Sequence, residues 1–482
     1  MDNPEVNQKR ELGLLDSTMI VVGSMIGSGI FIVTADVARN VGGAGFVLLT
    51  WLITGVMTLI GALSYGELAG MMPKVGGQFI YLKEAYGKLV AFLFGWCTFL
   101  VIQTGTIAAV AVAFAKYTGV LFPDYISETH FLINIPIGEK AFTISSVQLL
   151  AVISILLLTI LNLRGVKEAK FVQLVLTLVK AFALAGLIVL GISFGLKLDY
   201  LSVNWSNAWE SFSTNAAGIA TPVSGLALLS VIGLSMVGPL FSSSAWNNIT
   251  YTAGEVKDPK RDIPLSLFYG TLGVSSLYIL ANVAYLMVLP LAGKPDGTDI
   301  LSRGIMFATN DRVGTAAAEQ IFGSIGTVIM AIFIMISTFG CNNGLLLAGS
   351  RVYYSMAKEN LFFKQVGVLN KNGVPGFSLK LQSFWACLLC LSGTYGALLD
   401  YTVFTVLIFY VLTIVAIFIL RKKQPNADRP YKAFGYPIIP AIYVVLAALL
   451  CINLLIFRTQ TSLIGLIIVG LGFPVYYIWN RK

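Results

Sequence analysis

Two short stretches of this sequence place small, polar and helix-weakening residues inside long apolar runs. The first covers residues 22–31, with Gly27-Ser28-Gly29 near its centre, and the second covers residues 235–246, with Gly238-Pro239. In a helix interior, glycine costs about 1 kcal/mol and proline about 3 kcal/mol relative to alanine. Backbone groups that a break frees in hydrocarbon must find other partners. Two such breaks in matching parts of a chain predict a binding site at membrane depth.

The first break has the chemistry of an anion site. We expect the helix to unwind near Gly27 and to restart so that the N–H groups of Ser28, Gly29 and Ile30 point at an anion, with the half-helix dipole adding attraction. The hydroxyl of Ser28 can add a donor, and glycine lets a ligand approach the backbone closely. The alternative is a small-residue packing face made by Gly23 and Gly27.

The second break has the chemistry of a cation site. Pro239 lacks an N–H group and disrupts the turn before it, and the serines at 242–244, among them Ser242 and Ser244, can bond to freed backbone groups themselves. The exposed carbonyls suit an ammonium group, and Phe241 suits a lid over a small ligand, although core or lipid packing is the alternative for this ring. An anion site and a cation site together describe a zwitterion such as a free α-amino acid.

Lys180 is the one basic residue that we place deep in a span. It lies about 14 Å along its helix, near the middle of a hydrocarbon core of about 30 Å. An unpaired cation there costs at least about 2.5–3.5 kcal/mol. We expect Lys180 either to bond carbonyls of the first broken helix in place of a metal cation or to carry a proton, with snorkelling to the interface as the alternative.

Other polar groups are less informative. Asn342 and Asn343 either line the same cavity or bond across helices, and Glu67 and Glu255 are expected to form ion pairs with Lys or Arg. With one histidine and no phosphate-binding or dinucleotide-binding motif, the sequence predicts no enzyme, no cofactor and no metal site.

These residues sit in a chain whose composition predicts a polytopic membrane protein. Hydrophobic residues make up 57% and charged residues 11% of the 482, whereas soluble domains carry about 25% charged residues. Apolar runs long enough to span a bilayer predict twelve transmembrane helices, near 17–38, 44–70, 88–119, 146–163, 171–194, 222–250, 265–290, 320–349, 381–398, 401–420, 437–457 and 461–479.

The distribution of basic residues predicts the orientation. About three-quarters of the 32 Lys and Arg residues fall in loops on the side of the N-terminal tail, residues 1–16, and such loops are cytoplasmic. We therefore expect a multi-pass protein of the cell (inner) membrane with both termini cytoplasmic. The net charge of +9 follows from this bias and does not indicate a nucleic-acid partner.

A partial repeat relates the two breaks. Ser24-Met25-x-Gly27 matches Ser235-Met236-x-Gly238, and a phenylalanine follows each at a similar distance. Because five spans separate the two positions, the halves would insert with opposite topology. The prediction is an all-α fold with a first inverted repeat over 17–200, a second over 222–420, and two appended spans over 437–479.

Several motifs resemble the amino acid–polyamine–organocation superfamily, and within it most closely the L-type amino acid transporters and their bacterial relatives. The resemblance covers essentially all twelve spans, and the motifs that carry it follow one another in order between residues 27 and 264. They are Gly27-Ser28-Gly29-Ile30-Phe31, Ser64-Tyr65-Gly66-Glu67-Leu68, Gly76-Gly77-Gln78-Phe79-x-Tyr81, Phe241-x-x-x-Ala245-Trp246-Asn247 and the run 255–264.

The resemblance implies a LeuT-type fold and a set of roles. Ser28 and Gly29 would hold the substrate carboxylate, and carbonyls of Met25, Phe241 and Ser244 would take the amine. Phe241 would gate the site from outside. The position of Lys180 matches a lysine that replaces the sodium ion of LeuT-type carriers, which implies sodium independence.

From the residues and the resemblance we expect sodium-independent exchange of neutral L-amino acids by alternating access. Proton-coupled symport through Lys180 is the alternative mechanism, and a membrane sensor that binds amino acids without transporting them is the alternative of another class. Residues 121–143 contain no cysteine, so no disulfide-linked heavy subunit is expected. The serines at 242–244 differ from the usual family residues at this break, so the preference for a particular substrate side chain does not carry over from the family.

Overall fold

Long apolar helices dominate the computed structural model, which describes residues 10–137, 140–392 and 395–480. Within these ranges, ten helices are long and apolar enough to cross a membrane, or eleven when the bent pair α1–α2 is taken as one span. Their bounds are α1 (Leu14–Met25) with α2 (Gly29–Val41), α3 (Ala44–Met71), α5 (Lys88–Cys97) with the π-helical η1 (Thr98–Ile102) and α6 (Gln103–Leu121), α7 (Ser146–Leu163), α8 (Val166–Gly195), α10 (Gly225–Ser235) with α11 (Val237–Ser242), α13 (Pro259–Val288), α16 (Ser324–Lys358), α18 (Tyr395–Lys423), α19 (Ile438–Phe457) and α20 (Thr459–Asn480).

The remaining predicted span, 381–398, corresponds to a shorter helix. The helix α17 (Gly376–Ser392) has 17 residues and starts earlier than expected. Part of the predicted range lies at residues 393–394, outside the described residues. The all-α polytopic fold is therefore as predicted, while a count of twelve spans stays a prediction.

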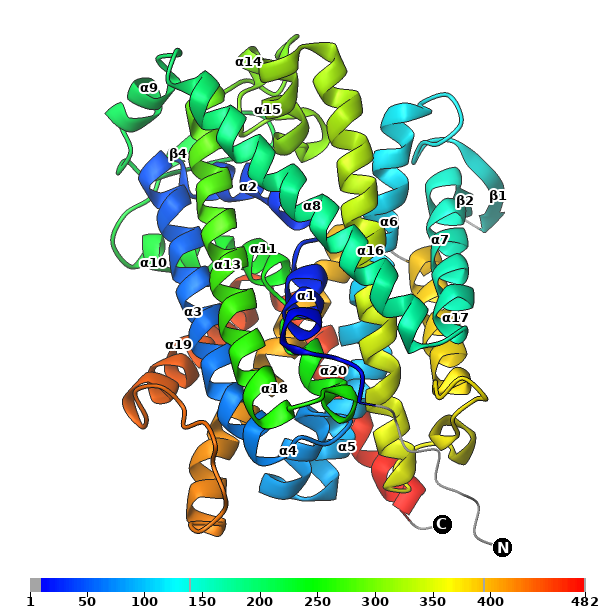
Figure 1. Ribbon diagram of the computed structural model, residues 1–482. Coiled ribbons are helices and arrows are strands. Elements are labelled where there is room, and N and C mark those ends of the chain that lie inside the picture. Colours follow the sequence, from blue (N-terminus) through cyan, green and yellow to red (C-terminus); the bar gives the residue numbers. More distant parts are fainter. Residues whose placement is uncertain (1–9, 138–139, 393–394, 481–482) are drawn as a thin grey trace, which may run out of the picture.

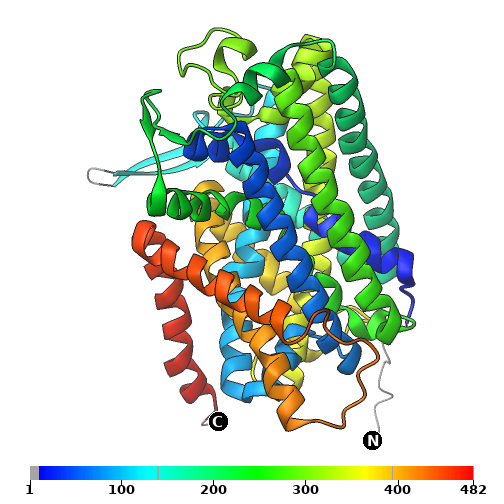
Figure 2. The same ribbon diagram turned by 90° about the vertical axis from the view of Figure 1, so that its left-hand side faces the viewer.

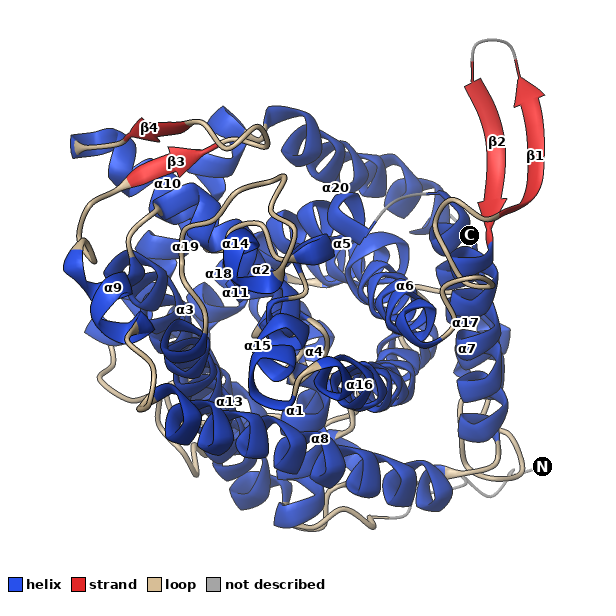
Figure 3. Ribbon diagram, turned by 90° about the horizontal axis from the view of Figure 1, so that it is seen from above, coloured by secondary structure: helices blue, strands red, loops and turns tan. Residues whose placement is uncertain are grey.

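Short elements connect the long helices. They are α4 (Gln78–Tyr86), α9 (Tyr200–Ser206), α12 (Asn248–Tyr251), η2 (Ala253–Glu255), α14 (Ile300–Arg303), η3 (Thr309–Asp311), α15 (Val313–Phe322) and η4 (Lys364–Gly367). Two antiparallel hairpins, β1 (Phe131–Ile137) with β2 (Lys140–Ser145) and β3 (Phe212–Thr214) with β4 (Ala220–Pro222), were not anticipated from the sequence. Figure 3 shows the first hairpin projecting beyond the helical bundle.

The broken first span lies at the centre of the bundle. In Figures 1 and 3, α1 is surrounded by α13, α8 and α16, and α2 continues from it toward the face that carries α14 and α15. The start of α1 and the end of α20, the helices nearest the two termini, lie toward the opposite face (Figures 1 and 2). We call these the distal face and the termini face. The second break falls in the sixth span, as the predicted repeat requires, and the inverted relation of the halves remains a prediction.

Peripheral helices show the pattern expected next to lipid. On α19 the exposed large side chains recur every three or four residues, and so form one apolar stripe: Ile442, Val445, Leu449, Ile452 and Ile456. An apolar stripe of this size on a soluble protein would drive association, whereas in a bilayer it faces acyl chains. Figure 2 shows α19 crossing the outside of the bundle.

Candidate functional site

The first break occurs where the sequence predicts it. The helix α1 ends at Met25 and α2 begins at Gly29, with a bend of 44° between the two axes. Between them Ile26 adopts extended backbone angles (φ −73°, ψ 95°). Ser28 is the N-cap residue of α2, is 1% exposed, and accepts a 3.1 Å bond from the N–H of Phe31 at its carbonyl. The first N–H groups of a helix have no partner within that helix, so α2 begins with donors directed into the break.

The second break lies further along the chain than predicted. We expected it to start at Gly238-Pro239, but α11 continues through both residues to Ser242. Pro239 sits in the first turn of α11, where its missing N–H removes no helical bond. The non-helical stretch is 243–247, in which Ala245 has a positive φ of 66°. The break therefore follows Phe241 instead of preceding it.

The two breaks meet in the middle of the protein. A Cβ atom built on Gly29 would lie only 2.0 Å from Oγ of Ser242, so this approach requires glycine. The hydroxyl of Tyr278, on α13, lies 3.0 Å from the carbonyl oxygen of Met25 and 3.1 Å from that of Ser242. Tyr278 thus joins the end of α1 to the end of α11. This role of Tyr278 is not predictable from the sequence, because a single tyrosine within an apolar span carries no signal of its own.

Lys180 reaches the first break from α8. Its ammonium nitrogen donates to the carbonyl oxygens of Gly23 at 2.5 Å and Ile26 at 2.8 Å, and lies 3.4 Å from that of Ser337. The lysine is 1% exposed, so it does not snorkel to a surface. The C-terminal end of a helix carries partial negative charge on its unpaired carbonyls. The lysine cation therefore neutralises the broken end of α1.

A serine on α16 supports the same carbonyls. The hydroxyl of Ser337 lies 3.2 Å from the carbonyl oxygens of both Ile26 and Gly27. Its neighbour Asn342 donates its amide N–H to the carbonyl of Ile107 on α6 at 3.2 Å. The cross-helix bond expected as one role of Asn342 is therefore present, and its place in the substrate site stays a prediction.

Serine hydroxyl groups already donate hydrogen bonds to backbone carbonyls at the second break. The carbonyl of Phe241 accepts bonds from the N–H (3.0 Å) and the hydroxyl (2.6 Å) of Ser244. The hydroxyl of Ser242 donates to the carbonyl of Gly238 at 2.8 Å. The Phe241 side chain is 6% exposed. An ammonium group that used the Phe241 carbonyl would have to share it with Ser244.

An uncharged cavity adjoins the second break. It lies between the residues after α11 and the helices α4, α5, α6, α16 and α18. Its lining comprises Gln78, Phe94, Ile102, Gln103, Thr106, Ser244, Ala245, Asn247, Asn248, Tyr251, Leu345, Val406, Phe409 and Tyr410. These are all uncharged, and residues 25–30 of the first break are not among them.

A hydrogen-bond network organises one wall of this cavity. The amide nitrogen of Asn247 lies 3.0 Å from Oε1 of Gln78 and 2.8 Å from the hydroxyl of Tyr251, and the hydroxyl of Tyr410 lies 3.2 Å from Oδ1 of Asn247. None of these four residues was predicted from the sequence to belong to a site. However, Gln78 and Asn247 belong to the family motifs at 76–81 and 241–247, and this membership was the one sequence signal that could have indicated a role in the site.

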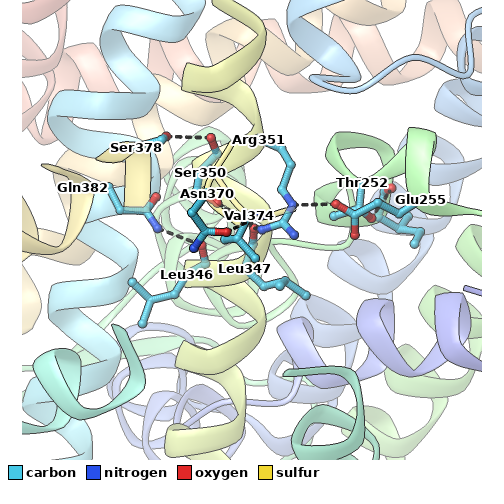
Figure 4. A network of polar contacts seen from close by, with 11 residues as sticks. Thr252, Glu255, Leu346, Leu347, Ser350, Arg351, Asn370, Val374, Ser378 and Gln382 are labelled. Atoms are coloured by element: carbon cyan, nitrogen blue, oxygen red, sulfur yellow. Dashed lines mark hydrogen bonds and ion pairs between the residues drawn. The ribbon is translucent and has the colours of Figure 1, made fainter. Parts of the chain in front are cut away.

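Buried ion pairs hold the termini face together. Glu255 of η2 pairs with Arg351 of α16 at 2.9 Å, and their side chains are 2% and 1% exposed. Figure 4 shows this pair beside bonds from Ser378 to the carbonyl of Ser350 and from Gln382 to that of Leu346. The predicted ion pairing of Glu255 is confirmed.

Glu67 makes a second ionic contact on the same face. Its carboxylate lies 2.7 Å from Arg421 and 3.3 Å from Arg429, and it accepts the N–H of Ala433 at 2.7 Å. These contacts tie α3 to α18 and to the segment after it, which confirms the predicted ion pairing of Glu67. In addition, Leu12 before α1 pairs with Val256 after η2 in a parallel bridge. The ends of both broken spans are thus joined on the termini face.

Comparison with known proteins places these features in a family. A family model described as amino acid permease matches residues 12–473. The chain is 31% identical over 479 residues to the large neutral amino acids transporter small subunit 2 of Homo sapiens, covering 98% of this chain and 82% of that protein. It is 28% identical over 477 residues to the serine/threonine exchanger SteT of Bacillus subtilis, covering 98% of both. It is also 28% identical over 446 residues to the b(0,+)-type amino acid transporter 1 of Mus musculus, covering 92% of this chain and 82% of that protein.

Proposed function

Because this chain belongs to the amino acid permease family, we propose that it exchanges neutral L-amino acids across the membrane by alternating access. The observation that carries the proposal is the meeting of the two breaks. A helix begins at Gly29 and another ends at Ser242, and the two are in direct contact. Positive and negative partial charges therefore lie side by side at membrane depth.

The α-carboxylate of the substrate would lie at the start of α2. The backbone of Gly29 and Ile30, with the hydroxyl of Ser28, supplies donors, and the dipole of α2 favours an anion. The ammonium group would lie against carbonyls at the ends of α1 and α11, from Met25, Phe241 and Ser244. Tyr278, which bonds to the backbone of both segments, would hold them at the spacing that one zwitterion needs.

Lys180 accounts for the proposed independence of sodium. Its ammonium group already occupies a position among the carbonyls of Gly23, Ile26 and Ser337. A carbonyl cage of this kind is what a sodium ion would need at a broken helix. A fixed cation there keeps the break neutralised without a coupling ion. Exchange then needs no ion gradient, since each substrate is moved against another.

The uncharged cavity would receive the side chain of the substrate. Its lining carries amides and hydroxyls as well as apolar groups, and lacks a charge that could pair with a charged side chain. Burying an unpaired charge is strongly unfavourable, which favours neutral substrates. The hydroxyl and amide groups at Ser244 and Asn247 favour serine- or threonine-like side chains, in keeping with the name of the Bacillus subtilis relative.

We further propose that the chain resides in the cell membrane with the termini face toward the cytoplasm. The bias of Lys and Arg toward loops on that side supports this orientation. The buried pair Glu255–Arg351 and the partly buried pair Glu67–Arg421 would then form the cytoplasmic gate. No disulfide-linked partner is included in the proposal, since residues 121–143 lack cysteine.

Flux measurements in reconstituted liposomes test the function. Uptake of labelled L-serine, L-leucine and L-lysine is measured in empty vesicles and in vesicles preloaded with unlabelled L-serine. Each measurement is repeated with sodium replaced by choline, and with and without a pH gradient. Exchange predicts uptake of the neutral substrates only into preloaded vesicles, unchanged by choline. Uptake into empty vesicles driven by a proton gradient would instead establish symport. Saturable binding without flux in any condition would establish a sensor.

A further inference from the structure

A wide crevice opens at the distal face, away from the uncharged cavity. It lies between the C-terminal part of α6, the segment that follows α6, and the turn that precedes α15. The residues of its lining that bear on its chemistry are Ile32, Lys116, Tyr117, Glu128, Asp311 and Arg312. It therefore gathers two basic and two acidic side chains beside an aromatic ring.

The acidic groups of the crevice are already engaged. The carboxylate of Glu128 pairs with Lys116 at 2.9 Å. That of Asp311 pairs with Arg39 at 2.6 Å, and Arg39 also donates to the carbonyl of Met306 at 2.6 Å. Two of the three cations near the crevice thus have their counter-charges within the protein.

The third cation, Arg312, is differently placed. Its guanidinium carbon lies 5.6 Å from the centre of the Tyr117 ring, and one of its nitrogens is 3.5 Å from the carbonyl of Lys116. Within the described ranges, no carboxylate lies within 4 Å of it. Burial lowers the pKa of Arg312, with Tyr117 and Glu128 acting in the opposite direction. A guanidinium remains protonated in proteins, so a half-buried cation without a bonded counter-charge faces this crevice.

The crevice is linked to the first break through α2. Ile32, which lines it, is three residues beyond Gly29 on the same helix. The helix α15, which begins after Arg312, packs against α2 so closely that a Cβ atom on Gly314 would lie 2.7 Å from the ring of Phe31. A ligand in the crevice is thus one short helical segment away from the proposed site.

We propose that Arg312 forms an outer binding station in which the carboxylate of an incoming amino acid is held before it moves to the two breaks. This inference rests on the proposed transport function. A guanidinium fork matches a carboxylate in two parallel hydrogen bonds, and the Tyr117 ring beneath it fixes its plane. The station acts on substrate arriving at the distal face and leaves the termini-face affinity unchanged.

The test compares the two faces of the reconstituted protein in exchange mode. Arg312→Gln is measured against the wild type for the KM of labelled L-serine supplied at the distal face and at the termini face, in vesicles of one orientation. The expected result is a distal-face KM raised about five- to tenfold, because a partly exposed charge-assisted bond is lost. The termini-face KM and the maximal rate stay unchanged.

Lys197→Gln is the matched control. Lys197 is an exposed cation just beyond the end of α8, so its loss removes the same charge without touching the crevice. Its distal-face KM should equal that of the wild type. An equal rise in both variants would reveal a general surface-charge effect and would overturn the station. Arg312→Lys keeps the charge but not the fork, and should give an intermediate KM.

Three further outcomes separate the explanations. If chloride stimulates exchange by the wild type and Arg312→Gln abolishes this stimulation, a free inorganic anion occupies Arg312 and the station for the amino acid is wrong. If the wild type exchanges amino acids and Arg312→Gln has the same distal-face KM as the wild type, the proposed binding station is wrong and the proposed transport function is unaffected. Absence of exchange by the wild type would instead refute the proposed function itself.

Discussion

Replacement of Lys180 by methionine removes one cation from the first break while keeping an unbranched side chain of similar length. The ammonium group makes two short bonds, to the carbonyls of Gly23 and Ile26, and one long contact, to that of Ser337. Hydrogen bonds to a charged group contribute about 1.5–3 kcal/mol each. The two short bonds therefore stabilise the broken end of α1 by about 3–6 kcal/mol.

The lower end of this range applies here. The hydroxyl of Ser337 lies 3.2 Å from the carbonyl of Ile26 and would remain available to it in the variant, so only the Gly23 carbonyl would lose its side-chain donor altogether. Each 1.4 kcal/mol changes an equilibrium about tenfold. A loss of about 3 kcal/mol lowers the population of the competent break, and with it the exchange rate, about 100-fold.

The assay is the initial rate of L-serine exchange in preloaded liposomes, with binding measured in parallel in detergent. Thr177→Val is the matched control on the same helix, since the Thr177 hydroxyl makes only long contacts, at 3.4 Å with the Met19 carbonyl in the unbroken part of α1 and at 3.5 Å with Nε2 of Gln173. The control should lose less than about threefold in rate. If Lys180→Met, monodisperse and able to bind substrate, exchanges within about threefold of the wild type, the argument from the carbonyl contacts is wrong.

Three further predictions concern the contacts around the site. Gly29→Ala places a methyl group against Ser242. Since overpacking costs about 1–3 kcal/mol, this variant should slow exchange at least about fivefold and lower the melting temperature. The exchange rate and the melting temperature are both measured on one preparation. Tyr278→Phe removes the hydroxyl that joins the breaks. A hydrogen bond contributes about 0.5–1.5 kcal/mol, so this variant should lower the exchange rate about two- to tenfold with little change in melting temperature. Glu255→Gln leaves Arg351 buried without a carboxylate, which costs about 3–5 kcal/mol, and should increase hydrogen exchange of residues 248–257.

The Gly29 and Glu255 predictions each have a control in the same chain. Gly186→Ala adds a methyl group where no atom lies within 4 Å, so its melting temperature should not fall. Asp428→Asn breaks an exposed pair with Lys260, whose side chains are 71% and 53% exposed, and such pairs contribute about 0–1 kcal/mol. If the Gly29 and Gly186 variants behave alike, or the Glu255 and Asp428 variants do, the packing and gate arguments respectively are wrong.

The central features of the site could be predicted because they depend on local chemistry. Consecutive small residues at Gly27 and Gly29 weaken a helix wherever it folds, and a lysine near the middle of an apolar run must find partners. For that reason, the first break and the contact of Lys180 with its carbonyls could be predicted from the sequence.

The remaining features depend on tertiary contacts. Whether Pro239 interrupts a helix depends on where that helix begins, and the turn at Met236 puts this proline in a tolerated position. Tyr278 becomes important only because α13 passes beside the ends of α1 and α11, where its hydroxyl reaches a carbonyl of each. The roles of Gln78 and Asn247 likewise require that α4 and the second break face one cavity, which no periodicity in either segment indicates.

The most direct test of the two-break site is competition by substrate analogues that lack one pole of the zwitterion. The exchange of labelled L-serine is measured against unlabelled L-serine, its carboxamide (serinamide), and its desamino analogue (3-hydroxypropionate). If the start of α2 binds the carboxylate and the ends of α1 and α11 bind the ammonium group, both analogues should compete at least about 100-fold more weakly than L-serine, since each leaves a charge-assisted site unfilled. Competition by either analogue at the concentration effective for L-serine would contradict the account.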